Sequence, residues 1–109
     1  MSRDKASLRD ILKAGNKILS FAAGVLTTEE LAADEMRLSA ILYEFIVIGE
    51  ATGRISSELR EQHLEIPWKK MAGMRNILAH QYDSVDLDLL RQAIESVLPD
   101  VLNKIEQII

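Results

Sequence analysis

The sequence predicts an all-α protein that folds as an antiparallel bundle of helices. Apolar residues recur at three- and four-residue spacing along almost the whole chain, and strict apolar–polar alternation is nowhere sustained, so strands are not required. The 109 residues leave room for one domain, residues 1–109, because folded domains usually hold about 100 to 150 residues around one core. Amphipathic stripes on helices with short connections bury themselves against one another, which gives a bundle.

The first half of the chain predicts two long helices with a short helical turn between them. A first helix is expected over about residues 4–23, with Gly24 as its natural stop. Thr27 and Glu30 then form a capping box, in which the threonine hydroxyl accepts a hydrogen bond from the glutamate amide. The central core helix should follow over about residues 35–56, where apolar side chains form one stripe.

The second half predicts two further helices, so that four main helices and a short one are expected. Ile66-Pro67-Trp68 marks one start, because proline fits the first helical position and disfavours helix in the residue before it. The last helix should begin near Asp86, a suitable N-cap residue. Because Pro99 removes a backbone hydrogen bond and clashes one turn back, a kink or short break is expected near residues 97–98.

Composition excludes several classes of site. Cysteine is absent, which excludes disulfides and thiolate metal sites, and His63 and His80 stand far apart, so no metal and no cofactor are expected. Seventeen acidic against thirteen basic residues give a net charge of −4, which opposes tight non-specific binding to nucleic acid. Any RNA site must therefore be a local patch.

No apolar run approaches the roughly 20 residues that a membrane-spanning helix needs. The charged start, residues 1–5, has no apolar core or cleavage site of a secretory signal. A cytoplasmic protein that does not bind membranes is expected.

One short segment concentrates chemically active side chains. Arg75, Asn76, His80 and Tyr82 place a permanent cation, an amide, a titratable base and a phenol within eight residues. On an ideal helix Asn76 and His80 lie one turn apart on one face, so the amide can orient the imidazole. Arg75 and His80 are separated by roughly 140°, however, and converge only if the helix loosens near Ala79 or a two-fold dimer brings in a second copy.

Such a set can catalyse transesterification of RNA without a metal, since the ribose hydroxyl attacks its own phosphate. With an unperturbed pKa of roughly 6.5, His80 can accept the hydroxyl proton or donate one to the leaving oxygen. The forked donors and constant charge of Arg75 suit stabilisation of the phosphorane.

A purely structural interpretation remains open beside this one. Arg75 can pair with a carboxylate such as Glu50. Asn76 and His80 can form a surface pair on the helix, and Tyr82 can close the bundle. A single histidine is weak evidence for catalysis.

Neighbouring residues carry their own alternatives. Trp68, Met71 and Met74 can form a base-stacking platform, but at helical spacing such residues more often belong to the core or to a dimer interface. Lys69 and Lys70 form either a solvated face or a patch that steers RNA phosphates.

Three further residues have simpler expectations. Glu50 and Arg54 stand one turn apart and should form a helix ion pair, although a contact from Glu50 to Arg75 is an alternative. Arg54 can also add to a basic cleft around Arg75. His63 lies in a polar segment and is expected to be exposed to solvent.

The stretch from Ile48 to about Leu90 resembles the HepT branch of the HEPN superfamily. The matching anchors are Ile48-Gly49-Glu50-Ala51, Ile66-Pro67-Trp68, Met74-Arg75-Asn76, His80, Tyr82 and Val85-Asp86-Leu87. An arginine, a polar residue, three further residues and a histidine form the superfamily's catalytic motif, and a tyrosine two places on is characteristic of HepT proteins. Residues 1 to about 35 match only as amphipathic helix.

The resemblance implies a HEPN-type bundle and a metal-independent endoribonuclease toxin of a toxin–antitoxin system. It implies a symmetric homodimer with Arg75 and His80 of both copies, supported by Asn76, facing one cleft. It also implies a partner nucleotidyltransferase antitoxin that adds AMP to Tyr82 and so silences the toxin. The alternative is an inactive helical binding module that pairs with a nucleotidyltransferase.

Overall fold

The computed structural model describes residues 2–25, 27–80 and 86–109, without the side chains of residues 2, 74 and 76–80. No strand occurs in these ranges, so the all-α prediction is confirmed. The long helices are α1 (Ser2–Ala22), α3 (Glu35–Gly53) and α5 (Trp68–His80). A fourth long unit joins α6 (Leu87–Gln92), a π-helical turn (Ala93–Val97) and α7 (Leu98–Ile108). The short helices are α2 (Thr28–Ala33) and α4 (Ser57–Gln62).

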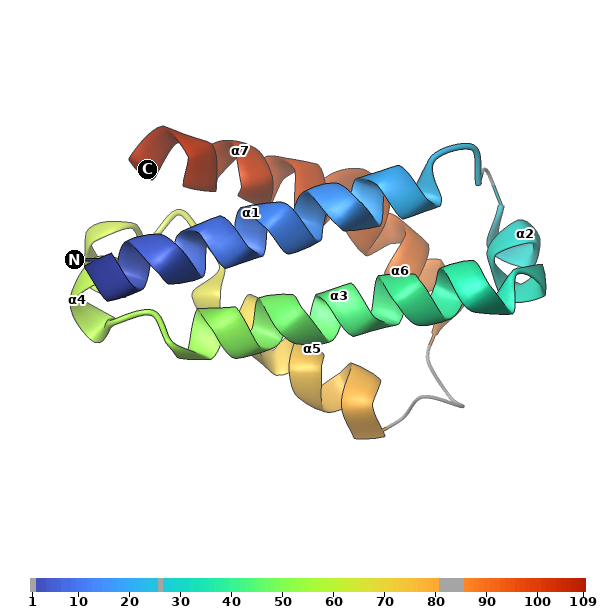
Figure 1. Ribbon diagram of the computed structural model, residues 1–109, viewed down its shortest axis with the longest axis horizontal. Coiled ribbons are helices and arrows are strands. Elements are labelled where there is room, and N and C mark those ends of the chain that lie inside the picture. Colours follow the sequence, from blue (N-terminus) through green and yellow to red (C-terminus); the bar gives the residue numbers. More distant parts are fainter. Residues whose placement is uncertain (1, 26, 81–85) are drawn as a thin grey trace.

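Helix α3 lies at the centre of the arrangement, between α1 and α5 (Figure 1). Helices α1 and α3 run antiparallel, and α7 packs along α1 (Figure 1). Side chains from all the long helices meet in one core, whose most buried members include Ile11, Ile18, Ile41, Phe45, Ile48, Met71 and Ile105. None of the described helices is both long enough and apolar enough to cross a membrane.

The connection between α1 and α3 follows the predicted signals. Gly24 ends α1 with a φ of 84°, a left-handed conformation that glycine adopts without steric cost. The Thr27 hydroxyl accepts a hydrogen bond from the Glu30 amide at 3.1 Å, which confirms the capping box. Asp34 then caps α3 by accepting from the Arg37 amide at 3.0 Å.

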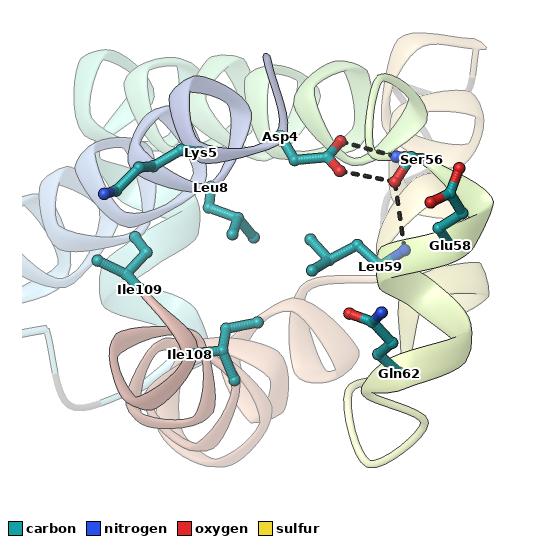
Figure 2. Close-up of a pocket in the computed structure, with 9 residues that line it drawn as sticks. All are labelled: Asp4, Lys5, Leu8, Ser56, Glu58, Leu59, Gln62, Ile108 and Ile109. Atoms are coloured by element: carbon teal, nitrogen blue, oxygen red, sulfur yellow. Dashed lines mark hydrogen bonds between the residues drawn. The ribbon is translucent and has the colours of Figure 1, made fainter. Parts of the chain in front are cut away.

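The end of α3 differs from the prediction of a helix to residue 56. The helix ends at Gly53, and Ser56 instead caps α4 by accepting from the Leu59 amide at 3.2 Å. The buried carboxylate of Asp4 fixes this turn, since it accepts from the Ser56 amide at 2.9 Å and the Ser56 hydroxyl at 2.6 Å (Figure 2). The unpredicted α4 had only a weak signal, a serine cap followed by the acidic Glu58.

The last helix begins and bends where the sequence indicates. Asp86 caps α6 by accepting from the amides of Asp88 and Leu89. At the predicted break the chain forms a π-helical turn, in which the Leu98 amide donates to the Ala93 carbonyl five residues back. The wider turn is a known way for a helix to accommodate Pro99, whose nitrogen cannot donate and whose ring crowds the preceding turn.

The Asp4–Ser56 interaction predicts a pH-dependent contribution to stability. The hydrogen bonds from the Ser56 hydroxyl and amide lower the pKa of Asp4 below its ordinary 3.8. Because the folded pKa is depressed, the stabilisation is present above the unfolded pKa and is lost as the pH falls through the folded pKa. We expect Asp4→Asn to lower the free energy of unfolding at pH 7 by about 1 kcal/mol, and this difference to close in acid.

Denaturant unfolding across this pH range measures the effect. Asp10→Asn is the matched control, because the Asp10–Arg54 ion pair is exposed and should contribute only about 0 to 1 kcal/mol. A gap between wild type and Asp4→Asn that persisted unchanged at the acid end would contradict the assignment.

Candidate active site

The start of α5 is anchored in the core by Trp68. Its indole nitrogen donates to the His63 carbonyl at 2.9 Å, and the Trp68 and Met71 side chains are buried. These two residues therefore belong to the core, as their helical spacing indicated. The side chain of Met74 lies outside the description.

His63 is not the solvent-exposed residue that was expected. Its side chain is only 27% exposed, and Nδ1 lies 3.5 Å from a carboxylate oxygen of Glu65. The His63 carbonyl, which accepts the hydrogen bond from the Trp68 indole, also accepts one from the Ile66 amide, so residues 63–66 form a turn. The polar character of the segment did not reveal this turn.

Helix α5 lies directly against α3 where Arg75 passes over Gly49. A Cβ atom built on Gly49 would stand 2.5 Å from Arg75 Cβ and 3.0 Å from the Arg75 amide nitrogen. Gly49 is itself buried, whereas Arg75 is exposed. The arginine therefore has its root pressed against α3 while its long side chain reaches the surface.

Arg75 and His80 belong to one uninterrupted helix. The main chain is α-helical throughout Trp68–His80, so the helix does not loosen near Ala79. At 100° and 1.5 Å per residue, the two positions are separated by roughly 140° around the axis and about 7.5 Å along it. One copy of the chain thus places Arg75 and His80 on different sides of α5.

The other predicted site residues are located only in part. Asn76 and His80 occupy one helical face by their spacing, as expected, and their side chains lie outside the description. Tyr82 lies outside the described residues altogether. Its expected role as a modified residue is therefore a prediction that the fold does not address.

The ion pair that Arg54 forms differs from the expectation. Arg54 pairs with Asp10 of α1 at 3.5 Å and not with Glu50, so the expected helix pair is wrong. Among the described side chains, no ion pair joins Arg75 to the exposed Glu50.

Lys69 and Lys70 are both exposed at the start of α5. They line an open depression of about 690 Å³ together with Arg60 and Glu61. The Arg60 guanidinium is engaged with the Thr52 carbonyl at 2.7 Å, and Glu61 brings a negative charge. Steering of RNA by the two lysines stays a prediction.

The outer face of α3 is unusually apolar for a helix side that meets solvent. Met36 is 86% exposed and Tyr43 63% exposed, and Ile46 and Val47 are half-buried beside them. Soluble helices usually confine apolar residues to the stripe that faces the core. We call Met36, Tyr43, Ile46, Val47 and Glu50 the outer face of α3; it borders Gly49 and hence the root of Arg75.

Comparison with known proteins identifies the class to which this bundle belongs. A protein of Methanocaldococcus jannaschii named "Putative RNase" is 33% identical over 102 residues, which cover 94% of this chain and 93% of the relative. A Thermococcus cleftensis protein named "Probable ribonuclease HepT" is 32% identical over 104 residues, covering 95% and 94%. No solved structure matches significantly.

The model of the family "Ribonuclease HepT-like" matches residues 11–108. The chain belongs to the HepT-like ribonuclease family. Its match extends into α1 as far as residue 11, in a region for which the sequence offered an amphipathic pattern and no motif.

Two features of the site were not found from the sequence. Gly49 was noticed only as part of a family anchor, and its role as the point where two helices touch requires the fold. The outer face of α3 was not predicted, because the sequence pattern was interpreted as a single apolar stripe facing the core. The further apolar residues outside that stripe were a signal that could have revealed it.

Proposed function

We propose that this protein is a cytoplasmic, metal-independent endoribonuclease and the toxin of a two-component toxin–antitoxin system. Family membership supports ribonuclease activity. The observation that carries the proposal is the placement of Arg75, an exposed guanidinium whose root is fixed against α3 on the helix that also carries His80.

The reaction needs only groups that RNA and this helix supply. The ribose 2′-oxygen attacks the adjacent phosphorus, the bond from phosphorus to the 5′-oxygen breaks, and a cyclic phosphate and a 5′-hydroxyl result. The imidazole of His80 takes the proton from the 2′-hydroxyl, and the imidazolium so formed returns a proton to the 5′-oxygen. Arg75 stabilises the negative charge that develops on the phosphorane, and Asn76 orients the imidazole.

The active form in this proposal is a two-fold symmetric dimer. Positions 75 and 80 lie roughly 140° apart around a continuous helix, so in this proposal two copies of the chain together present an Arg75 and a His80 to one phosphate. A two-fold axis beside α5 brings Arg75 of one copy towards His80 of the other. The outer face of α3 supports this arrangement, because it is apolar, it is uncovered in one copy and it borders the root of Arg75.

Regulation in this proposal acts through Tyr82. A partner nucleotidyltransferase antitoxin transfers AMP to the phenol oxygen, and the added phosphate lies two residues from His80 in sequence. Its negative charge competes for Arg75, and its bulk occupies space needed by RNA. Family resemblance supports this regulation, and Lys69 and Lys70 are proposed to attract the RNA strand.

The second candidate function is a helical module that binds a nucleotidyltransferase and has no activity of its own. The net charge of −4 and the mixed charges around Lys69 and Lys70 favour it over a broad RNA-binding surface. Growth on expression without a partner separates the two, because only an active toxin should arrest it.

Cleavage by the purified protein tests the proposed chemistry. We expect RNA cleavage in EDTA, and a loss of about 100-fold or more in rate for Arg75→Ala and for His80→Ala. Mixing the two variants should restore up to about a quarter of wild-type activity, because half of randomly mixed dimers join an intact Arg75 to an intact His80 across the axis.

The matched control mixes Arg75→Ala with the double variant Arg75→Ala/His80→Ala. These mixed dimers contain no intact pair, so no activity should return. Full cleavage by His80→Ala would remove the mechanism, and failure of the first mixture to recover would remove the shared site.

The oligomeric state tests the outer face of α3. We expect a wild-type dimer and, for Tyr43→Glu, at least a 10-fold weaker dimer, because two charges would be buried close to the axis. Leu64→Glu is the control, since Leu64 is 80% exposed but lies between α4 and α5, outside that face. Analytical ultracentrifugation separates these outcomes, and a monomeric wild type would refute the proposed dimer.

Modification is tested by co-expression with the proposed partner nucleotidyltransferase, followed by intact-mass and peptide analysis. We expect a mass gain of one or more AMP units that Tyr82→Phe abolishes and Tyr43→Phe retains. The chain has two tyrosines, so this pair is a complete control. An unmodified protein, or a nucleotide mapped elsewhere, would contradict the role of Tyr82.

A further inference from the structure

We propose that Gly49 is a positioning residue that sets where the Arg75 guanidinium reaches the surface. It does so by allowing α5 to lie against the main chain of α3. The inference rests on the proposed function in one respect, because that proposal assigns to Arg75 the stabilisation of charge on the phosphorane. The contact itself is a property of the fold.

The space above Gly49 is filled by atoms that cannot turn aside. A Cβ at this position would stand 2.5 Å from Arg75 Cβ, 3.0 Å from its amide nitrogen and 3.2 Å from its Cα. Carbon atoms in favourable contact lie about 3.5 to 4.0 Å apart. Because these atoms belong to the root of Arg75 and its main chain, no change of rotamer relieves the overlap, and α5 must move by about 1 Å.

The other helical glycines show that this requirement is specific. A Cβ on Gly53, four residues later in α3, or on Gly73 in α5 would have no heavy atom within 4 Å. A Cβ on Gly15 would overlap the Leu102 side chain, which is the far end of a flexible group between α1 and α7. Of these positions, only Gly49 touches a proposed catalytic residue.

A shift of this size affects catalysis more than it affects folding. Arg75 lies on the α3 side of α5 and is exposed, so a displaced root moves the guanidinium relative to the phosphate. A misplacement of about 1 Å can reduce a rate by about 100-fold. We therefore expect Gly49→Ala to lower kcat by about 10- to 100-fold, with a smaller change in KM.

The test compares three alanine substitutions in single-turnover cleavage of one defined RNA oligonucleotide. Gly53→Ala is the control for the helix propensity of alanine, and Gly15→Ala is the control for an overlap elsewhere in the bundle. Each is also measured in an Arg75→Lys background. If Gly49 acts through Arg75, Gly49→Ala should cost much less there, whereas a general structural defect should cost the same in both backgrounds.

The result that supports the inference is a loss of kcat in Gly49→Ala alone that shrinks in the Arg75→Lys background. Wild-type activity in Gly49→Ala, an equal loss in Gly15→Ala, or an equal loss in both backgrounds would overturn it. If Gly49→Ala does not fold, Arg75→Gly is added to remove the Cβ that is overlapped most. The approaches to the Arg75 amide nitrogen and Cα remain, so a partial gain in stability over Gly49→Ala supports the contact, and no gain at all overturns it.

A second measurement does not depend on cleavage. The ¹H–¹⁵N resonance of the Arg75 Nε–H should shift in Gly49→Ala and stay unchanged in Gly53→Ala. If the wild-type protein cuts no RNA, the proposed function fails and this resonance alone decides the inference. An Arg75 resonance that Gly49→Ala leaves in place would overturn it.

Discussion

The close packing of α5 on α3 is the contact on which the arrangement of this bundle depends. Gly49 allows two helix backbones to meet, and Trp68 holds the start of α5 through its bond to the His63 carbonyl. Fixed at these two points, α5 has a defined direction across α3 (Figure 1). The exposed and buried sides of α5 follow from that direction, and so does the surface from which Arg75 emerges.

The same contact also bears on the proposed dimer. A continuous α5 separates Arg75 and His80 around its axis, and the uncovered outer face of α3 lies beside the arginine. In a monomer, the first observation would leave the two residues of the motif on different sides of one helix. The second would leave an apolar surface exposed to water. Both are accounted for if two copies share one site.

Much of the fold was predictable because its signals are local. Thr27 and Asp86 cap helices, Gly24 ends one, and Pro99 perturbs another, each through chemistry confined to a few neighbouring residues. The end of α3 was misplaced because Asp4, 52 residues away in sequence, holds Ser56 in the cap of α4. Such distant contacts leave no mark in a local pattern.

The candidate site also combines features that local sequence signals predict with features that depend on tertiary contacts. Arg75, Asn76 and His80 remain candidates chosen from their chemistry and spacing, and the start of the helix that carries them was predicted from Ile66-Pro67-Trp68. The partner of Arg54 was predicted wrongly, because spacing along a helix favours Glu50 whereas tertiary packing supplies Asp10. The role of Gly49 could not be predicted either. A glycine marks a close contact between helices only when the residue packed against it is known, and that residue, Arg75, is identified by the fold.

The π-helical turn at Ala93–Val97 constrains how the C-terminal half of this chain can change length. The π-helical turn contains one residue more than an α-helical turn. This extra residue sets which faces of α6 and α7 point towards the core. A deletion of one residue within the turn would rotate one helix by about 100° relative to the other. Either Leu90 or Val101 would then leave the interior, so insertions and deletions should be tolerated far better in the connections than in this turn.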